Sequence, residues 1–178
     1  MPNENENKAL PLEIERKFLI EMPDPAFLRG LLGCRELSIE QTYLKKDSDY
    51  RARVRRTVCD GAAVCTHTAK KAIGRATRIE LEHVISGEEY EVYLLQRDPE
   101  RHTVEKTRFA FPFGSHTVEI DIFPFWTKQA ILEIELADEN EDVPLPPFVR
   151  LIREVTEDPA FTNASLAADP SLFAQHKN

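Results

Sequence analysis

Short segments in which apolar and charged residues alternate recur along the chain. The clearest span residues 12–18, 78–82, 118–122 and 132–136, with a looser fifth at 104–109. Successive side chains of a β-strand point to opposite faces, so each segment predicts a strand with one apolar and one charged face. The charged positions mix carboxylates with Arg and Lys at the same two-residue spacing. We therefore expect these strands to line one shared charged enclosure.

The same alternation, bounded by turn formers, predicts eight strands, at residues 11–21, 37–46, 50–59, 63–71, 75–85, 101–112, 115–123 and 130–138. Asp60-Gly61 and residues 113–115 predict hairpin turns. Asp24-Pro25 predicts the start of one helix and the capping box at 86–89 the start of another, and one or two short helices are expected after Pro147. The predicted fold is α+β: an eight-stranded antiparallel β-barrel with helices packed outside and a wet, charged lumen.

Composition restricts the class of protein. A chain of 178 residues with 42% hydrophobic and 30% charged residues predicts one soluble domain, at 10–178, preceded by a mobile tail at 1–9. The net charge of −8 argues against a nucleic-acid partner. No apolar run reaches the roughly 20 residues of a membrane span, and the N-terminus does not resemble a secretory signal. Three cysteines suit a reducing, cytoplasmic location.

Strand parity sorts the charged residues by face. The expected inward acids are Glu13, Glu15, Glu80, Glu82, Glu119, Asp121, Glu133 and Glu135. The expected inward bases are Lys17, Arg53, Arg55, Lys70, Arg78, Lys106 and Arg108, with Arg51 in the same phase. Arg and Lys suit phosphate oxygens, and paired carboxylates suit Mg²⁺ or Mn²⁺, so the set predicts a metal-dependent phosphoryl-transfer site.

The opposite parity predicts surface charges at Arg16, Arg56, Lys71 and Glu105. Tyr43 and Trp126 are interpreted as packing residues. A solvated sheet face with cross-strand ion pairs would explain any one of these pairs, although it explains five coincident segments less well.

The order of the motifs resembles the CYTH superfamily, the triphosphate tunnel metalloenzymes. The matching segments are ExExK at 13–17, QxYL at 41–44, RxR at 53–55, TxK at 68–70, RxExE at 78–82, KTRY at 106–109, ExDxF at 119–123, EIEL at 133–136 and an EVT…YxNxxL tail at 154–166. The chain departs from the family pattern at Thr42, Phe109, Val118 and Phe161. The resemblance covers residues 11–168, nearly the whole chain.

The resemblance implies an eight-stranded tunnel, open at both ends, in which a C-terminal helix sometimes plugs one end. Its implied metal ligands for Mg²⁺ or Mn²⁺ are Glu13, Glu15, Asp121, Glu133 and Glu135. Its implied triphosphate-binding residues are Lys17, Arg53, Arg55, Lys70, Arg78, Lys106 and Arg108. Glu13, Glu15 and Lys17 are the implied catalytic residues, with Lys17 orienting either the attacking water or the terminal phosphate. Arg51-Ala52-Arg53 also fits RxR, which leaves Arg51 and Arg55 as alternatives.

The implied activity is metal-dependent hydrolysis of the terminal phosphoanhydride of a small triphosphate, with inorganic triphosphate as the first choice. A class IV adenylate cyclase would need a purine pocket, and a thiamine triphosphatase would need an aromatic site, for which Phe125 and Trp126 are the candidates. A non-catalytic module that binds polyphosphate or a nucleotide would need the bases but not the carboxylates. A homodimer is an open alternative, because nothing in the sequence sets the oligomeric state.

Overall fold

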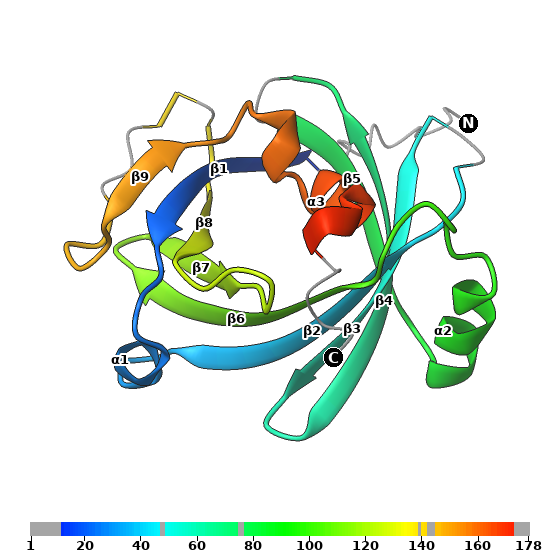
Figure 1. Cartoon of the computed structure of the whole chain (residues 1–178), viewed down its shortest axis with the longest axis horizontal. Helices are drawn as coiled ribbons and strands as arrows, with labels where there is room; N and C mark the ends of the chain where they lie inside the picture. Colours follow the sequence, from blue (N-terminus) through cyan, green and yellow to red (C-terminus); the bar gives the residue numbers. More distant parts are fainter. Residues whose placement is uncertain (1–11, 47–48, 75–76, 139, 142–144, 173–178) are drawn as a thin grey trace, which may run out of the picture.

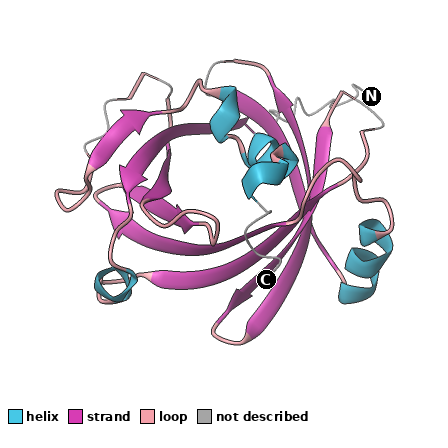
Figure 2. Cartoon of the chain, viewed as in Figure 1, coloured by secondary structure: helices cyan, strands magenta, loops and turns pink. Residues whose placement is uncertain are grey.

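The protein is a nine-stranded, mostly antiparallel β-sheet with few helices (Figures 1 and 2). The computed structural model describes residues 12–46, 49–74, 77–138, 140–141 and 145–172. The predicted tail at 1–9 lies outside these residues. The strands are β1 (Leu12–Glu21), β2 (Arg35–Tyr43), β3 (Arg51–Cys59), β4 (Ala62–Ala72), β5 (Thr77–Ile85), β6 (Val104–Phe113), β7 (His116–Ile122), β8 (Gln129–Glu135) and β9 (Leu151–Glu154). The helices are α1 (Pro25–Arg29), α2 (Gly87–Leu94) and α3 (Asn163–Ala168), with 3₁₀ turns η1 (Pro159–Phe161) and η2 (Pro170–Leu172).

The sheet has the order β5-β4-β3-β2-β6-β7-β8-β1-β9, and β1 pairs additionally with β5. The additional pairing joins residues 12–14 of β1 to 77–79 of β5. Along the rest of the same edge, residues 18–20 of β1 pair with β9. The eight predicted strands are therefore confirmed within a few residues, but β9 was not predicted. Its four residues are too few to display a period.

The predicted turns and helix starts are confirmed by their local geometry. Asp60 and Gly61 have φ angles of 49° and 80°, the left-handed pair that a tight two-residue hairpin between β3 and β4 requires. The Asp24 side chain accepts a hydrogen bond from the Ala26 N–H at 2.9 Å, ahead of α1. Ser86 begins α2 with the predicted capping box.

The outer face of the sheet carries the apolar side chains of the alternating segments. Phe18, Phe109, Ile120 and Leu132 pack in one cluster with Leu28 of α1. A second outer cluster places Tyr90 of α2 against β3 and β5. The prediction that apolar residues lie under external helices is confirmed for these strands. Since the apolar side chains occupy the outer face, the charged side chains of the same strands occupy the inner face.

The inner face is not charged along its whole length. At one end Leu19, Phe123 and Ile131 share the parity of the inward charges but form an apolar cluster with Leu166 and Ala167 of α3. Figure 1 shows α3 lying inside the curve of the strands. The main-chain N–H of His102 donates to the Ala167 carbonyl at 2.7 Å, which fixes the helix there. Within the described residues, no helix is both long and apolar enough to cross a membrane.

Candidate active site

Two cavities meet on the inner face of the sheet. The larger, of about 430 Å³, has six cations in its lining and two acids, with uncharged residues making up the rest; the cations are Lys17, Lys46, Arg51, Arg53, Lys70 and Lys71, and the acids are Glu15 and Asp49. The smaller, of about 60 Å³, is lined by Glu13, Glu15, Thr117, Glu119, Glu133 and Glu135. Glu15 lines both. Some of the inward charges are thus separated into a basic chamber and an acidic chamber, whereas others line neither of them: Arg55, Glu80, Glu82, Lys106, Arg108 and Asp121.

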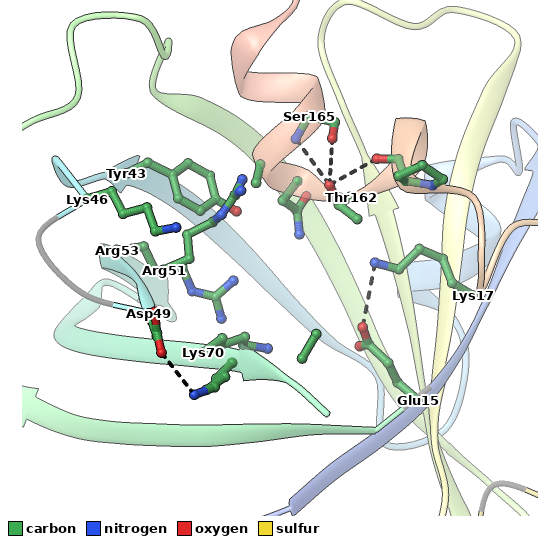
Figure 3. Close-up of a pocket in the computed structure, with 15 residues that line it drawn as sticks. Glu15, Lys17, Tyr43, Lys46, Asp49, Arg51, Arg53, Lys70, Thr162 and Ser165 are labelled. Carbon is green, nitrogen blue, oxygen red and sulfur yellow. Dashed lines mark hydrogen bonds and ion pairs between the residues drawn. The ribbon is translucent and has the colours of Figure 1, made fainter. Parts of the chain in front are cut away.

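The basic chamber is enclosed by β1, β2, β3 and β4 on the sheet side and by the C-terminal segment opposite (Figure 3). Thr162 and Ser165 face it from the start of α3, and the Thr162 hydroxyl donates to the Ser165 hydroxyl at 2.9 Å. Arg53 is 6% exposed, and its Nε–H is buried without a hydrogen-bond partner among the described residues.

A continuous ion-pair chain crosses β6, β7, β8 and β1 beside the chambers. Asp121 accepts from Lys106 and, at 2.6 and 2.7 Å, from the Nε–H and Nη2–H of Arg108. Arg108 also donates to Glu133 at 2.8 Å, and Glu133 lies 2.7 Å from Lys17 Nζ. All five side chains are buried. The network orients Lys17 toward the chamber while leaving no buried charge unpaired.

The pKa shifts in this chain follow from burial and its neighbours. Burial raises the pKa of Glu133, but Lys17 and Arg108 outweigh it and hold that pKa well below its ordinary value. Asp121 is held low in the same way by Arg108 and Lys106. Burial and the Arg108 charge lower the pKa of Lys106 to about 8. The carboxylates of the chain are therefore fixed as anions.

A second ion-pair group joins β1, β3, β4 and β5. Lys70 Nζ lies 2.7 and 2.6 Å from the two carboxylate oxygens of Glu13 and 2.8 Å from Glu80. Arg53 approaches Glu80 at 3.7 Å. Burial raises the pKa of Glu13, and the neighbouring Glu80 carboxylate raises it further. These two causes outweigh the attraction of Lys70, which lowers it. Within this group, Lys70 lines the basic chamber and Glu13 lines the acidic chamber.

Both alternatives for the second arginine of the RxR motif lie on the inner face, in different roles. Arg51 lines the basic chamber. Arg55 instead donates to the Gln41 side-chain carbonyl at 3.3 and 3.1 Å. Burial and the charges of Arg53 and Arg108 lower the pKa of Arg55 to about 10. Arg78 lies in β5 opposite Glu13, but its side chain is outside what the structure describes.

The acidic chamber has the donors that a hard divalent cation prefers, five carboxylates within a space of about 60 Å³. Glu119 belongs to this chamber, whereas Asp121 does not line it and is held by two cations. Burial raises the pKa of Glu119, with a further contribution from Glu133. Across the described part of the chain, no His, Cys, Asp or Glu group has the arrangement of a metal centre. The carboxylate oxygens of this chamber are of the kind that a hard cation binds, but they are not gathered as a metal centre, and Glu13 and Glu133 are paired with lysines.

The two residues that follow β9, Val155 and Thr156, hold the backbone of Lys17. The Lys17 N–H donates to the Thr156 hydroxyl at 3.0 Å, and the Val155 N–H donates to the Lys17 carbonyl at 2.8 Å. Thr156 in turn donates to Glu154 at 2.7 Å, and Glu154 forms a bidentate pair with Arg16 at 3.0 and 2.7 Å. We call the Arg16, Glu154 and Thr156 side chains the β1 clasp.

Sequence reasoning placed some residues incorrectly or assigned them no site role. Lys71 was predicted to lie outside but lines the basic chamber, where its Nζ lies 3.3 Å from the exposed Asp49. Tyr43 packs in the apolar cluster as predicted and also lines the chamber. Lys46 and the hydroxyls of the C-terminal segment were not identified. Lys46 ends the predicted strand at 37–46 on the parity opposite to Gln41 and Tyr43, and the hydroxyls of Thr162 and Ser165 lie outside every predicted strand.

An antiparallel sheet whose inner face holds a cationic chamber beside a carboxylate chamber defines a protein that binds a small polyanion. No protein-family model matches the chain. The chain is 32% identical over 161 residues to the curated inorganic triphosphatase of Acetivibrio thermocellus, covering 89% of this chain and 94% of that protein. By this relationship the chain belongs to the CYTH-like inorganic triphosphatase family.

Solved structures agree with this relationship. The crystal structure of the inorganic triphosphatase NE1496 has a TM-score of 0.56 and 26% identity, covering 88% of this chain and 95% of that one. The PH1819 protein from Pyrococcus horikoshii OT3 has a TM-score of 0.54 and 22% identity, covering 72% and 80% of the two chains. The second likeness concerns the fold alone.

Proposed function

We propose that this protein hydrolyses inorganic triphosphate to diphosphate and phosphate inside a closed eight-stranded tunnel. The observation that carries the proposal is the separation of a cationic chamber from a carboxylate chamber, with Glu15 shared by both. The inorganic triphosphatase from Acetivibrio thermocellus supports the choice of substrate. Pairing of β1 with β5 supports closure, because it joins the first strand of the ring to the last.

In the proposed complex the triphosphate lies in the basic chamber, where its oxygens accept from Lys17, Arg53 and Lys70. Arg51 is the proposed second arginine of the RxR motif at the chamber wall, because Arg55 is instead hydrogen-bonded to Gln41. Catalysis of phosphoryl transfer rests mainly on such positioning and charge stabilisation.

Hydrolysis joins a water oxygen to the terminal phosphorus and breaks that phosphorus–oxygen anhydride bond, so diphosphate leaves. Glu15 lies where the two chambers meet, 3.7 Å from Lys17 Nζ. Its carboxylate is placed to accept the proton of the attacking water, while Lys17 compensates the charge that develops on the terminal phosphate. This division of roles assigns Lys17 to the phosphate rather than to the water.

Glu13, Glu15, Glu119, Glu133 and Glu135 are the residues that would hold a divalent cation, Mg²⁺ or Mn²⁺. A bound cation would supply Lewis-acid neutralisation of phosphate oxygens. Asp121, predicted as a ligand from the family resemblance, is proposed instead to position Lys106 and Arg108, since both of its carboxylate oxygens are engaged with these cations.

Neither alternative enzymatic function, adenylate cyclase or thiamine triphosphatase, is favoured by a specific contact. Phe125 and Trp126, the candidate thiamine site, pack on one another with ring centroids 5.3 Å apart and on Phe123. An ordinary apolar cluster therefore accounts for them.

The test is phosphate release from inorganic triphosphate, thiamine triphosphate, ATP and long polyphosphate, each with Mg²⁺, with Mn²⁺ and with EDTA. We expect inorganic triphosphate to give the highest kcat/KM and EDTA to abolish release. Full activity in EDTA would refute the carboxylate chamber as a cation site. Preference for ATP or thiamine triphosphate would refute the substrate assignment while leaving the polyanion chamber in place.

A further inference from the structure

Lys17 lies between two short ladders on one edge of β1. β5 pairs with residues 12–14 of this edge, and β9 pairs with residues 18–20. In the interval, the Val155 N–H donates to the Lys17 carbonyl at 2.8 Å, and the Lys17 N–H donates to the Thr156 hydroxyl at 3.0 Å. A side-chain oxygen therefore takes the place at Lys17 that the main chain of a partner strand has in the two ladders.

The Thr156 hydroxyl is directed toward Lys17 as an acceptor, and Glu154 sets this direction. A hydroxyl has one proton. Thr156 donates it to Glu154 at 2.7 Å, whereas the Lys17 carbonyl is 3.4 Å away. Glu154 is itself held by the Nε–H and Nη2–H of Arg16, at 3.0 and 2.7 Å. Because the proton points to Glu154, the oxygen of Thr156 is left to accept from the Lys17 N–H.

The side chain of Lys17 extends from this point to the junction of the two chambers. Its Nζ lies 2.7 Å from Glu133 and 3.7 Å from Glu15, which lines both chambers. An ammonium at the end of a flexible four-carbon chain keeps such distances only when the main chain that carries it is fixed. The β1 clasp fixes that main chain without contributing a side chain to either chamber.

We propose that Thr156 is a positioning residue for Lys17: its hydroxyl fixes the main chain of β1 so that the Lys17 ammonium meets the terminal phosphate at the moment of transfer. The inference rests on the proposed function, in which Lys17 compensates the charge that develops on that phosphate. A misplacement of about 1 Å at a reacting centre costs roughly 100-fold in rate. The other cations of the basic chamber hold the substrate before reaction, so the clasp acts on kcat and not on KM.

Thr156→Val removes the hydroxyl at nearly constant shape. In phosphate release from inorganic triphosphate with Mg²⁺ it should lower kcat about 10-fold and leave KM within about twofold of the parent's. Thr156→Ser keeps the hydroxyl and should restore kcat to within about twofold. Ser86→Ala is the matched control, because the Ser86 hydroxyl also accepts from a main-chain N–H, at the start of α2, and lines neither chamber. It should keep the parent's kcat and KM.

Hydrogen exchange supplies a readout that needs neither substrate nor metal. The Lys17 main-chain N–H of the ligand-free protein, followed by NMR, should exchange about 10-fold faster or more in Thr156→Val, and at the parent's rate in Ser86→Ala. All kinetics are measured at a temperature where thermal unfolding shows each variant folded.

Two further variants separate positioning from a general loss of structure. In a Lys17→Met background, Thr156→Val should change kcat by less than about twofold, because the group that it positions is absent. Glu154→Ala leaves Thr156 in place but removes the acceptor of its proton. This half-exposed outer residue should lower kcat about threefold, and add no loss to Thr156→Val. It carries the test if Thr156→Val does not fold.

Equal fold losses from Thr156→Val in the parent and in Lys17→Met would overturn the inference, as would a loss that appears in KM alone. A Thr156→Val or Glu154→Ala protein with the parent's kcat, while the parent hydrolyses triphosphate, overturns the positioning role and leaves the proposed function standing. A parent that releases no phosphate from triphosphate overturns the proposed function and the inference with it.

Discussion

Replacing Asp121 by Asn tests the ion-pair chain most directly. The Asp121 side chain is 1% exposed and accepts from Lys106 and from two N–H groups of Arg108. Asn has nearly the same shape but no charge, and its NH₂ group cannot accept from either cation. Breaking a buried ion pair by removing one partner costs about 3–5 kcal/mol of unfolding free energy.

For a chain of this length each kcal/mol corresponds to about 2–4 °C in Tm, so Asp121→Asn should lower the Tm of the ligand-free protein by about 6–20 °C. The measurement is thermal unfolding in EDTA. Glu105→Gln, an exposed neighbour on the outer face of β6, removes one carboxylate without breaking a buried pair and should leave Tm within about 2 °C.

The same substitution should increase the stabilisation that the ligand gives to the protein. Loss of one buried negative charge leaves Lys106 and Arg108 under-neutralised, so inorganic triphosphate in EDTA should raise the Tm of Asp121→Asn by more than it raises the parent's. A Tm equal to the parent's would show that Asp121 is not the acceptor of this network. If triphosphate raised the Tm of Asp121→Asn by less than it raises the parent's, the charges of Lys106 and Arg108 would not act on the ligand in the chamber.

The remaining predictions concern the acidic chamber, the β1 clasp and acid stability. Glu13→Gln should lower kcat/KM for triphosphate by roughly 100-fold or more while the protein stays folded, since one charge is removed from the acidic chamber; near-parental turnover would exclude Glu13 from the site. Thr156→Val leaves the Lys17 N–H unsatisfied and should cost about 1–3 kcal/mol in denaturant unfolding, whereas Thr156→Ser should cost much less. Because the folded-state pKa values of Asp121 and Glu133 are lowered, the stability they contribute is present at neutral pH and should be lost as pH falls below their ordinary values of 3.8 and 4.5. A free energy of unfolding that does not change from pH 6 to pH 3 would contradict this predicted loss of stability in acid.

The alternation of apolar and charged residues determined the strands and the face of each strand. Side-chain direction on a strand depends only on position, so Lys106, Arg108 and Asp121 could be assigned to the inner face without any tertiary information. Turn and cap residues such as Asp60 and Ser86 act through local geometry, and their predictions are likewise confirmed.

Parity says which face a residue occupies, but not which neighbour it meets there. Only strand pairing separated Glu13 and Glu119 into an acidic chamber from Arg53 in a basic one, because register brings together residues far apart in sequence. The same holds for the β1 clasp, because Thr156 is 139 residues from Lys17 in the sequence and follows a strand, β9, that is too short to show a period. The sequence by itself determined the strands and the charge of their inner face, and the tertiary structure alone decided how those charges are paired, since pairing is a property of three-dimensional proximity.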